Sequence, residues 1–178
     1  MHRTALRIAA VSLALLPTIA LAHPGHEGAG LVDGFLHPLG GIDHIIAMVA
    51  VGLLAARLGG RALWLVPASF VAAMTAAGLV ASAGVALPYV ETGIAVSVVV
   101  LGAIAVLGMA MPVAVAMGLV AFFAVFHGYA HGAEMPETVS GLAYGAGFVA
   151  ATALLHGVGI GLGLLIGQVS RSAVRRAA

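Results

Sequence analysis

Histidine and acidic side chains concentrate in two short stretches of the sequence. In the first, residues 37–44 read His-Pro-Leu-Gly-Gly-Ile-Asp-His. The proline and the two glycines predict a turn, and Asp43 then lies near the start of a helix, where a carboxylate can cap free backbone N–H groups. Capping does not account for His37 and His44. Two imidazoles and a carboxylate at one turn are ligands typical of divalent transition metals, so we predict a metal-binding role for His37, Asp43 and His44.

The second stretch, residues 127–134, reads His-Gly-Tyr-Ala-His-Gly-Ala-Glu. His127 and His131 are four residues apart and therefore share one face of a helix, and Glu134 extends that stripe by a further turn. The alternative is a pair of buried histidines that bond only to the backbone. Two imidazoles and a carboxylate on one stripe favour a metal-ligand role for His127, His131 and Glu134.

Four isolated residues are weaker candidates. Glu91 lies at the start of a predicted span, where it is either a metal ligand or a complement to the helix dipole. His156 lies deep in the last apolar stretch and is either a ligand or a structural hydrogen-bond donor. If the chain is cleaved after residue 22, the free amine and imidazole of His23 can chelate an ion, with His26 as a further donor; the alternative is a solvated tail.

The composition excludes several classes of protein. The chain is 62% hydrophobic and 7% charged, whereas soluble domains carry about 25% charged residues. It contains no cysteine, which excludes disulfides, thiolate metal sites and cysteine nucleophiles. The sequence shows no lysine, so the phosphate-binding motif of ATPases cannot form. A net charge of +1 without a basic patch does not fit a nucleic-acid-binding protein.

The N-terminal segment predicts export. Residues 1–22 contain Arg3 and Arg7, a short apolar run and a final Ala-Leu-Ala, which together are typical of a cleavable signal peptide. The alternative is a first transmembrane helix that stays attached. Cleavage leaves an external, histidine-containing tail at 23–36 and a transmembrane domain at 37–178.

The rest of the chain predicts an all-α membrane protein. A span needs about 20 mainly apolar residues. We expect a bundle of five transmembrane helices, at 41–57, 62–84, 89–110, 112–131 and 139–167. The last stretch would be about 43 Å long as one helix, longer than the roughly 30 Å hydrocarbon core. It is therefore one tilted or kinked helix, or two short helices and six spans in all.

The arginines indicate the orientation. Cytoplasmic loops are enriched in basic residues. Five spans with an external N-terminus place all the arginines beyond the signal peptide on the cytoplasmic side, namely Arg57, Arg61, Arg171, Arg175 and Arg176. Six spans would place the last three outside. The sequence thus predicts a multi-pass protein of the cytoplasmic membrane with its C-terminus inside, and with acids and histidines gathered at the outer surface to collect cations.

Three strings resemble the HupE/UreJ family of nickel/cobalt permeases: residues 37–44 with Met48, residues 126–136, and residues 147–156. The resemblance covers nearly the whole chain. It implies uptake of nickel or cobalt that supplies the maturation of hydrogenase or urease, and no enzymatic activity. It also implies functional importance for His37, Asp43, His44, Phe70, Glu91, His131 and Glu134. Phe70 enters this set through the resemblance alone, since its residue type is otherwise typical of a core.

We therefore predict secondary, non-ATP uptake of Ni²⁺ or Co²⁺ by a membrane protein whose partners are the ion and the lipid bilayer. No resident cofactor is expected. Imidazole and carboxylate also suit zinc, so the identity of the metal rests on the resemblance. The alternatives are a membrane metal sensor or chaperone that does not transport, a haem protein with paired axial histidines, and an intramembrane metalloenzyme, although the His-Glu-x-x-His motif is absent.

Overall fold

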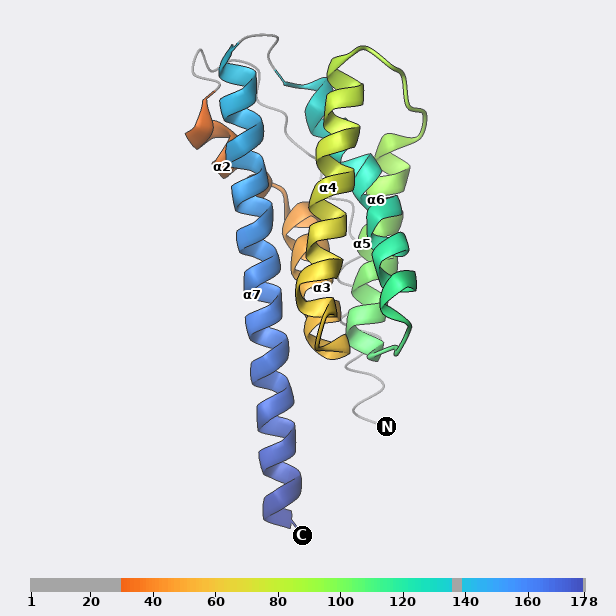
Figure 1. Ribbon diagram of the computed structural model, residues 1–178, viewed down its shortest axis with the longest axis vertical. Coiled ribbons are helices and arrows are strands. Elements are labelled where there is room, and N and C mark those ends of the chain that lie inside the picture. Colours follow the sequence, from red (N-terminus) through yellow and green to blue (C-terminus); the bar gives the residue numbers. More distant parts are fainter. Residues whose placement is uncertain (1–29, 136–138, 178) are drawn as a thin grey trace.

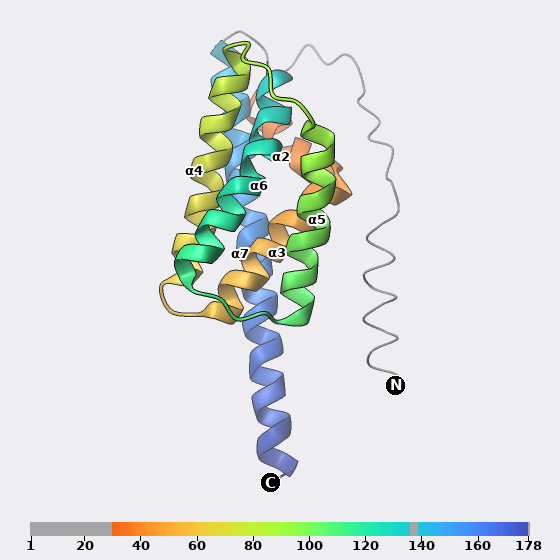
Figure 2. The same cartoon turned by 90° about the vertical axis from the view of Figure 1, so that its right-hand side faces the viewer.

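The computed structural model describes residues 30–135 and 139–177, and these residues contain helices and no β-strand. The helices follow one another along the chain as α2 (Leu31–Gly40), α3 (Ile42–Leu58), α4 (Ala62–Ser82), α5 (Val90–Leu107), α6 (Val113–Ala133) and α7 (Val139–Ala177). The longer ones run roughly parallel or antiparallel to one another as a bundle, and α7 extends well beyond its lower end (Figures 1 and 2). The predicted signal peptide lies outside the described residues.

The five predicted spans correspond to α3 to α7, so the all-α fold is confirmed. Four helical segments are long and apolar enough to cross a membrane: α4, α5, α6 and residues 141–168 of α7. Helix α3 has 17 residues and counts toward a fifth crossing only together with α2. The alternative of two short helices after residue 139 is wrong, because α7 is one continuous helix of 39 residues.

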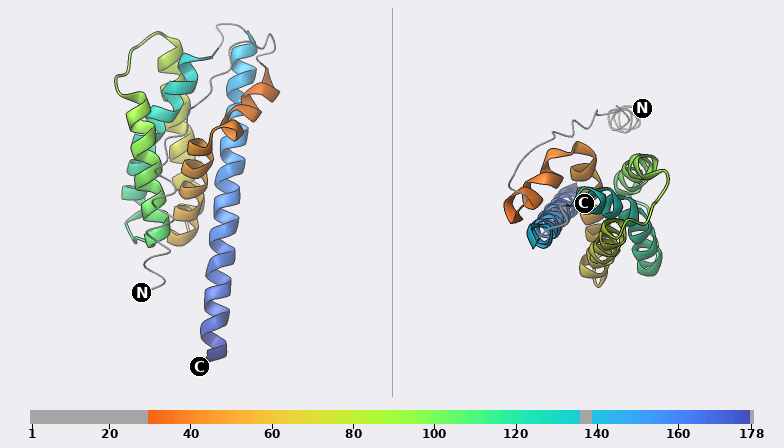
Figure 3. Two further views of the ribbon diagram at one scale, coloured as in Figure 1. Left: turned by 180° about the vertical axis from the view of Figure 1, so that it is seen from behind. Right: turned by 90° about the horizontal axis from the view of Figure 1, so that it is seen from above.

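Helix α2 was not predicted. The sequence predicts an external tail as far as residue 36 and a turn at Pro38, Gly40 and Gly41. In the structure these residues are helical as far as Gly40, with Pro38 inside the helix. The break falls at Gly41, which has extended backbone angles. There the chain turns by 88° from α2 into α3, so that α2 leans away from the bundle beside the start of α7 (Figure 3).

The two ends of the bundle carry different charges. The α3–α4 and α5–α6 connections lie at one end (Figure 2). Arg57 and Arg61 lie there, and the guanidinium of Arg57 reaches the backbone at Gly108. The end of α6 and the α4–α5 connection lie at the other end, and α3 begins between the two ends (Figure 2). The described carboxylates lie toward this second end, in the first turns of α2, α3 and α5 and directly after α6, namely Asp33, Asp43, Glu91 and Glu134.

Close backbone contact at glycines joins α3 to α7. A Cβ atom on Gly52 would collide with the carbonyl oxygen of His156, and a Cβ atom on Gly159 would collide with that of Val49. Small residues allow such close approach between membrane helices, where van der Waals packing drives association. These contacts fix the position of His156 along α3. A similar pair joins α2 to α7 at Gly34 and Gly147.

The same device joins α4 to α6. A Cβ atom on Gly128 would collide with the carbonyl oxygen of Met74, and one on Gly132 would collide with that of Gly78. Because Gly128 directly follows His127, and Met74 lies one turn after Phe70, this contact places His127 beside Phe70. The glycines of α6 therefore set the position of its histidines.

We expect Gly159→Ala to lower the free energy of unfolding by about 1–3 kcal/mol, because the new methyl group would force α3 and α7 apart. Thermal unfolding of the purified protein in detergent measures the change. Gly161→Ala is the matched control on the same helix, since a Cβ atom there has nothing within 4 Å. Equal stability of the two variants would contradict the assigned role of Gly159.

Candidate metal centre

Three side chains meet at the carboxylate-bearing end of the bundle. His37 comes from α2, His131 from the last turn of α6, and Glu134 from the residue that follows α6. The Glu134 carboxylate lies 3.7 Å from Nε2 of His37 and 4.0 Å from Nδ1 of His131. Each residue offers one potential ligand atom, and these three atoms lie within 4.8 Å of one another. We call His37, His131 and Glu134 the outer group.

Three imidazoles, one of them from the outer group, also lie close together. Nε2 of His44, from the first turn of α3, lies 2.6 Å from Nε2 of His131 and 3.1 Å from Nδ1 of His127. The ring centroid of His44 lies 4.5 Å from that of His131 and 4.7 Å from that of His127. We call His44, His127 and His131 the inner group. His131 belongs to both groups and links them.

The spacing of the inner group suits ligands of one ion. Two nitrogens bound at right angles to a metal, each about 2.1 Å from it, lie about 3 Å apart. The distances of 2.6 and 3.1 Å are close to that value. They are too short for a haem iron between either pair, since axial ligands lie about 4 Å apart. The outer group is wider, and modest side-chain rotation would close it around an ion.

Exposure falls steadily from the outer group to the inner group. The side chains of Glu134 and His37 are 58% and 40% exposed, whereas that of His131 is 12% exposed. His44 and His127 are buried. A hydrated cation can therefore reach the outer group first, and it must exchange water for protein ligands to reach the inner one.

Asp43 acts on the inner group through its neighbour. Its Oδ1 lies 3.3 Å from Nδ1 of His44, on the opposite side of the ring from the nitrogen that faces His127 and His131. A carboxylate that holds the second nitrogen of a histidine orients the ring and makes it a stronger ligand. Asp43 therefore supports His44, and its negative charge lies near any cation that the inner group binds.

Phe70 contacts both a histidine of the inner group and His156. The ring of Phe70 is buried. Its centroid lies 5.9 Å from the ring centroid of His127 and 5.2 Å from that of His156. His156 is also buried, and neither of its ring nitrogens has a hydrogen-bond partner in the part of the chain that the structure describes. An unsatisfied buried polar group costs about 1–3 kcal/mol, so His156 is a costly residue to keep at this depth.

One described candidate, Glu91, does not join the two groups. Glu91 is exposed in the first turn of α5, and among the described residues no hydrogen bond, ion pair or ring contact connects it to the histidines. His23 and His26 lie outside the described residues. The structure thus gathers His37, Asp43, His44, His127, His131 and Glu134, with Phe70 and His156 below them.

Ser97 and Phe148, which are not among the predicted candidates, also contact these histidines. Ser97, buried in α5, has its Oγ atom 2.7 Å from Nε2 of His127. The ring of Phe148, in α7, lies 4.3 Å from that of His131. The only signal for Ser97 is a hydroxyl within an apolar span. Phe148 shares its helix face with His156, eight residues later, which is the spacing of two helical turns.

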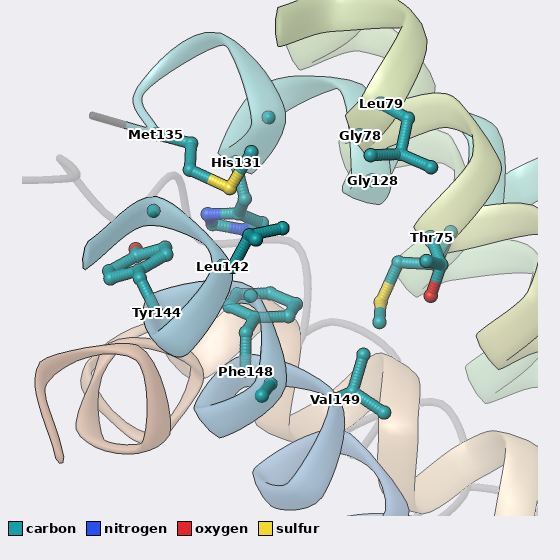
Figure 4. Close-up of a pocket in the computed structure, with 15 residues that line it drawn as sticks. Thr75, Gly78, Leu79, Gly128, His131, Met135, Leu142, Tyr144, Phe148 and Val149 are labelled. Atoms are coloured by element: carbon teal, nitrogen blue, oxygen red, sulfur yellow. The ribbon is translucent and has the colours of Figure 1, made fainter. Parts of the chain in front are cut away.

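A cavity of about 360 Å³ opens beside His131, between α4, α6 and α7. Figure 4 shows His131 on its wall, near Phe148 and Leu142. The other lining residues are almost all glycine or apolar. Such a wall offers a hydrated ion few polar contacts, so the stacked imidazoles, and not this cavity, mark the candidate route of a cation.

The separation of Glu91 from the histidines has a measurable consequence. We expect His131→Ala to weaken nickel binding by the purified protein by at least about tenfold, because both groups lose a ligand. Glu91→Gln should change the dissociation constant less than about twofold. Isothermal titration with nickel in detergent measures both. Equal weakening by the two substitutions would mean that Glu91 is a direct ligand.

Comparison with known proteins identifies the family of this chain. The family model described as "HupE / UreJ protein" matches residues 11–178. The protein named Protein HupE from Rhizobium leguminosarum bv. viciae is 47% identical over 150 residues, which cover 84% of this chain and 78% of that protein. No solved structure matches. The chain therefore belongs to the HupE/UreJ family.

Proposed function

We propose that this protein takes up divalent transition-metal ions, nickel or cobalt, across the cytoplasmic membrane. Transport, and not catalysis, is its function, and the imported ion supplies the maturation of a hydrogenase or urease. Membership of the HupE/UreJ family supports the substrate class. The observation that carries the proposal is the overlap of two ligand groups at His131, one exposed and one buried.

The overlap provides a path by ligand exchange. An ion first binds the outer group, where Glu134 offsets part of its charge and His37 supplies a nitrogen. The ion enters the inner group through His131. Nδ1 of His131 lies 4.0 Å from Glu134 and its Nε2 faces His44, so the ion passes from one nitrogen of this ring to the other. His44 and His127 then replace the outer donors. Transport needs sites that bind strongly enough to admit an ion and weakly enough to release it.

Below the inner group, His156 is the next donor toward the cytoplasm. The ring of Phe70 contacts the rings of both His127 and His156, and in this proposal an ion passes from one histidine to the other only when Phe70 moves aside. The two unpartnered nitrogens of His156 favour a role as the ligand of the inner half. In this scheme Phe70 is a barrier between outer and inner ligands, which accounts for an aromatic residue at this position.

No phosphate-binding motif is present in the sequence, and we propose facilitated diffusion down a gradient that intracellular metal capture maintains. The carboxylate-bearing end faces outward and the arginine-bearing end faces the cytoplasm, in agreement with the positive-inside rule. Helices α4, α5, α6 and α7 span the membrane, and the bent pair α2–α3 forms a fifth crossing. The N-terminal tail is then external, where His23 and His26 bind metal loosely before the outer group does.

We expect His131→Ala and Asp43→Asn to abolish nickel accumulation while the amount of protein in the membrane stays unchanged. The first removes the ligand that both groups share, and the second removes the carboxylate that orients His44. Radiolabelled nickel uptake into cells or proteoliposomes, with cobalt and zinc as competitors, measures the effect.

Asp33→Asn is the matched control, because Asp33 is an exposed acid at the same end of the bundle that contacts only backbone at Gly30 in the described hydrogen bonds. Its uptake should equal that of the wild type. Undiminished uptake by His131→Ala would remove the two ligand groups from the path, and failure of the wild type to accumulate nickel would overturn the proposed function.

The orientation can be tested with single cysteines, because the chain has none of its own. Ala86 and Ala110 are both exposed and lie in loops at opposite ends of the bundle. We expect a membrane-impermeant maleimide to label Ala86→Cys in intact cells and to label Ala110→Cys only after the membrane is opened. The reverse pattern would place the outer group in the cytoplasm and exclude uptake by this path.

A further inference from the structure

Ser97 is a buried polar residue in the middle of α5 that the transport path does not use directly. Its side chain has no exposed surface. Its Oγ atom makes two short contacts, at 2.6 Å to the carbonyl oxygen of Ile94 and at 2.7 Å to Nε2 of His127. The second contact lies on the far side of the His127 ring from Nδ1, which faces His44.

Counting protons assigns a direction to both contacts. A carbonyl oxygen can only accept a hydrogen bond, and a serine hydroxyl has a single proton to donate. The Ser97 proton therefore points to Ile94, in the pattern that serine commonly adopts within helices. The Oγ atom must then accept the proton of His127 Nε2. His127 is held in the tautomer that carries its proton on Nε2 and a lone pair on Nδ1.

The same count applies to His44. The Asp43 carboxylate accepts a hydrogen bond from Nδ1 of His44, so the lone pair of His44 is on Nε2. Nδ1 of His127 and Nε2 of His44, 3.1 Å apart, are then two acceptors that face each other. The proton on Nε2 of His131 can serve His44 at 2.6 Å but leaves His127 without a donor. A cation between the two nitrogens would satisfy both lone pairs.

We propose that Ser97 is a positioning residue of the inner group: by accepting the Nε2 proton of His127, it keeps the lone pair of Nδ1 directed at the ion. Asp43 does the same for His44 from the opposite side of the group. This inference rests on the proposed function for the identity of the ion. Its structural part, the tautomer of His127, is independent of transport.

The experiment compares three substitutions in the full-length protein in lipid. Ser97→Ala removes the acceptor, Ser97→Thr retains it, and Ser69→Ala is the matched control. Ser69 makes the same type of bond to the carbonyl three residues before it, at 2.8 Å to Val66, but it contacts no histidine in the described hydrogen bonds. The probe is nickel alone, and binding and uptake are measured together with the ¹⁵N spectrum of His127, assigned by its loss in His127→Gln.

In metal-free wild type and in Ser97→Thr at pH 8, the ¹⁵N shifts should report a proton on Nε2 of His127. In Ser97→Ala both tautomers should appear, and nickel affinity should fall by about 10–100-fold, as is typical when the group that orients a ligand is lost. Ser97→Thr and Ser69→Ala should bind nickel within about threefold of the wild type, a margin well inside that loss.

Two results would overturn the inference. One is a proton on Nδ1 of His127 in the wild type, and the other is unchanged nickel affinity in Ser97→Ala when His127→Gln is defective. Failure of the wild type to bind or accumulate nickel would instead overturn the proposed function. The tautomer measurement distinguishes these outcomes, because it requires no metal and also separates loss of the acceptor from general loosening of the bundle.

Discussion

The contact of His44 with the two histidines of α6 is the interaction on which the candidate metal centre depends. The backbones of α3 and α6 approach each other at few positions, whereas α3 packs extensively on α7 and α4 packs extensively on α6. The imidazoles therefore meet where the α3–α7 pair adjoins the α4–α6 pair. A ligand group at this boundary takes its donors from both pairs, which no single helix could supply.

Glycines make this arrangement possible. In α6, Gly128 and Gly132 alternate with His127 and His131, so the face that packs on α4 lies beside the face that carries the ligands. In α7, Gly159 brings the backbone onto α3 just beyond His156. Membrane helices gain little from hydrophobic association, and they depend on close packing of this kind. The short spacing between glycine and histidine thus couples the packing of the bundle to the geometry of the metal centre.

Buried imidazoles are costly unless each nitrogen has a partner. Asp43 and Ser97 satisfy the outward-facing nitrogens of His44 and His127, which leaves the inward-facing nitrogens directed at one another. A histidine that binds a cation typically has one ring nitrogen hydrogen-bonded to a polar partner and the lone pair of the other nitrogen directed at the ion. His156 differs, because the described structure satisfies neither of its nitrogens. Nδ1 of His131 likewise has no hydrogen-bond partner among the described residues, so unsatisfied nitrogens occur within the two ligand groups as well as at His156.

The sequence alone determined the class of protein, the positions of α3 to α7, and the two stretches that carry the ligands, because hydropathy and the spacing of His127 and His131 are local properties. It did not reveal α2, since ten residues that contain Pro38 lack the length of a span and resemble a turn. Only the tertiary structure decided that His44 contacts both α6 histidines, that Ser97 supports His127, and that Glu91 stands apart. Those relations join residues 30 to 87 positions apart, and they follow from how helices pack, which local sequence patterns do not encode.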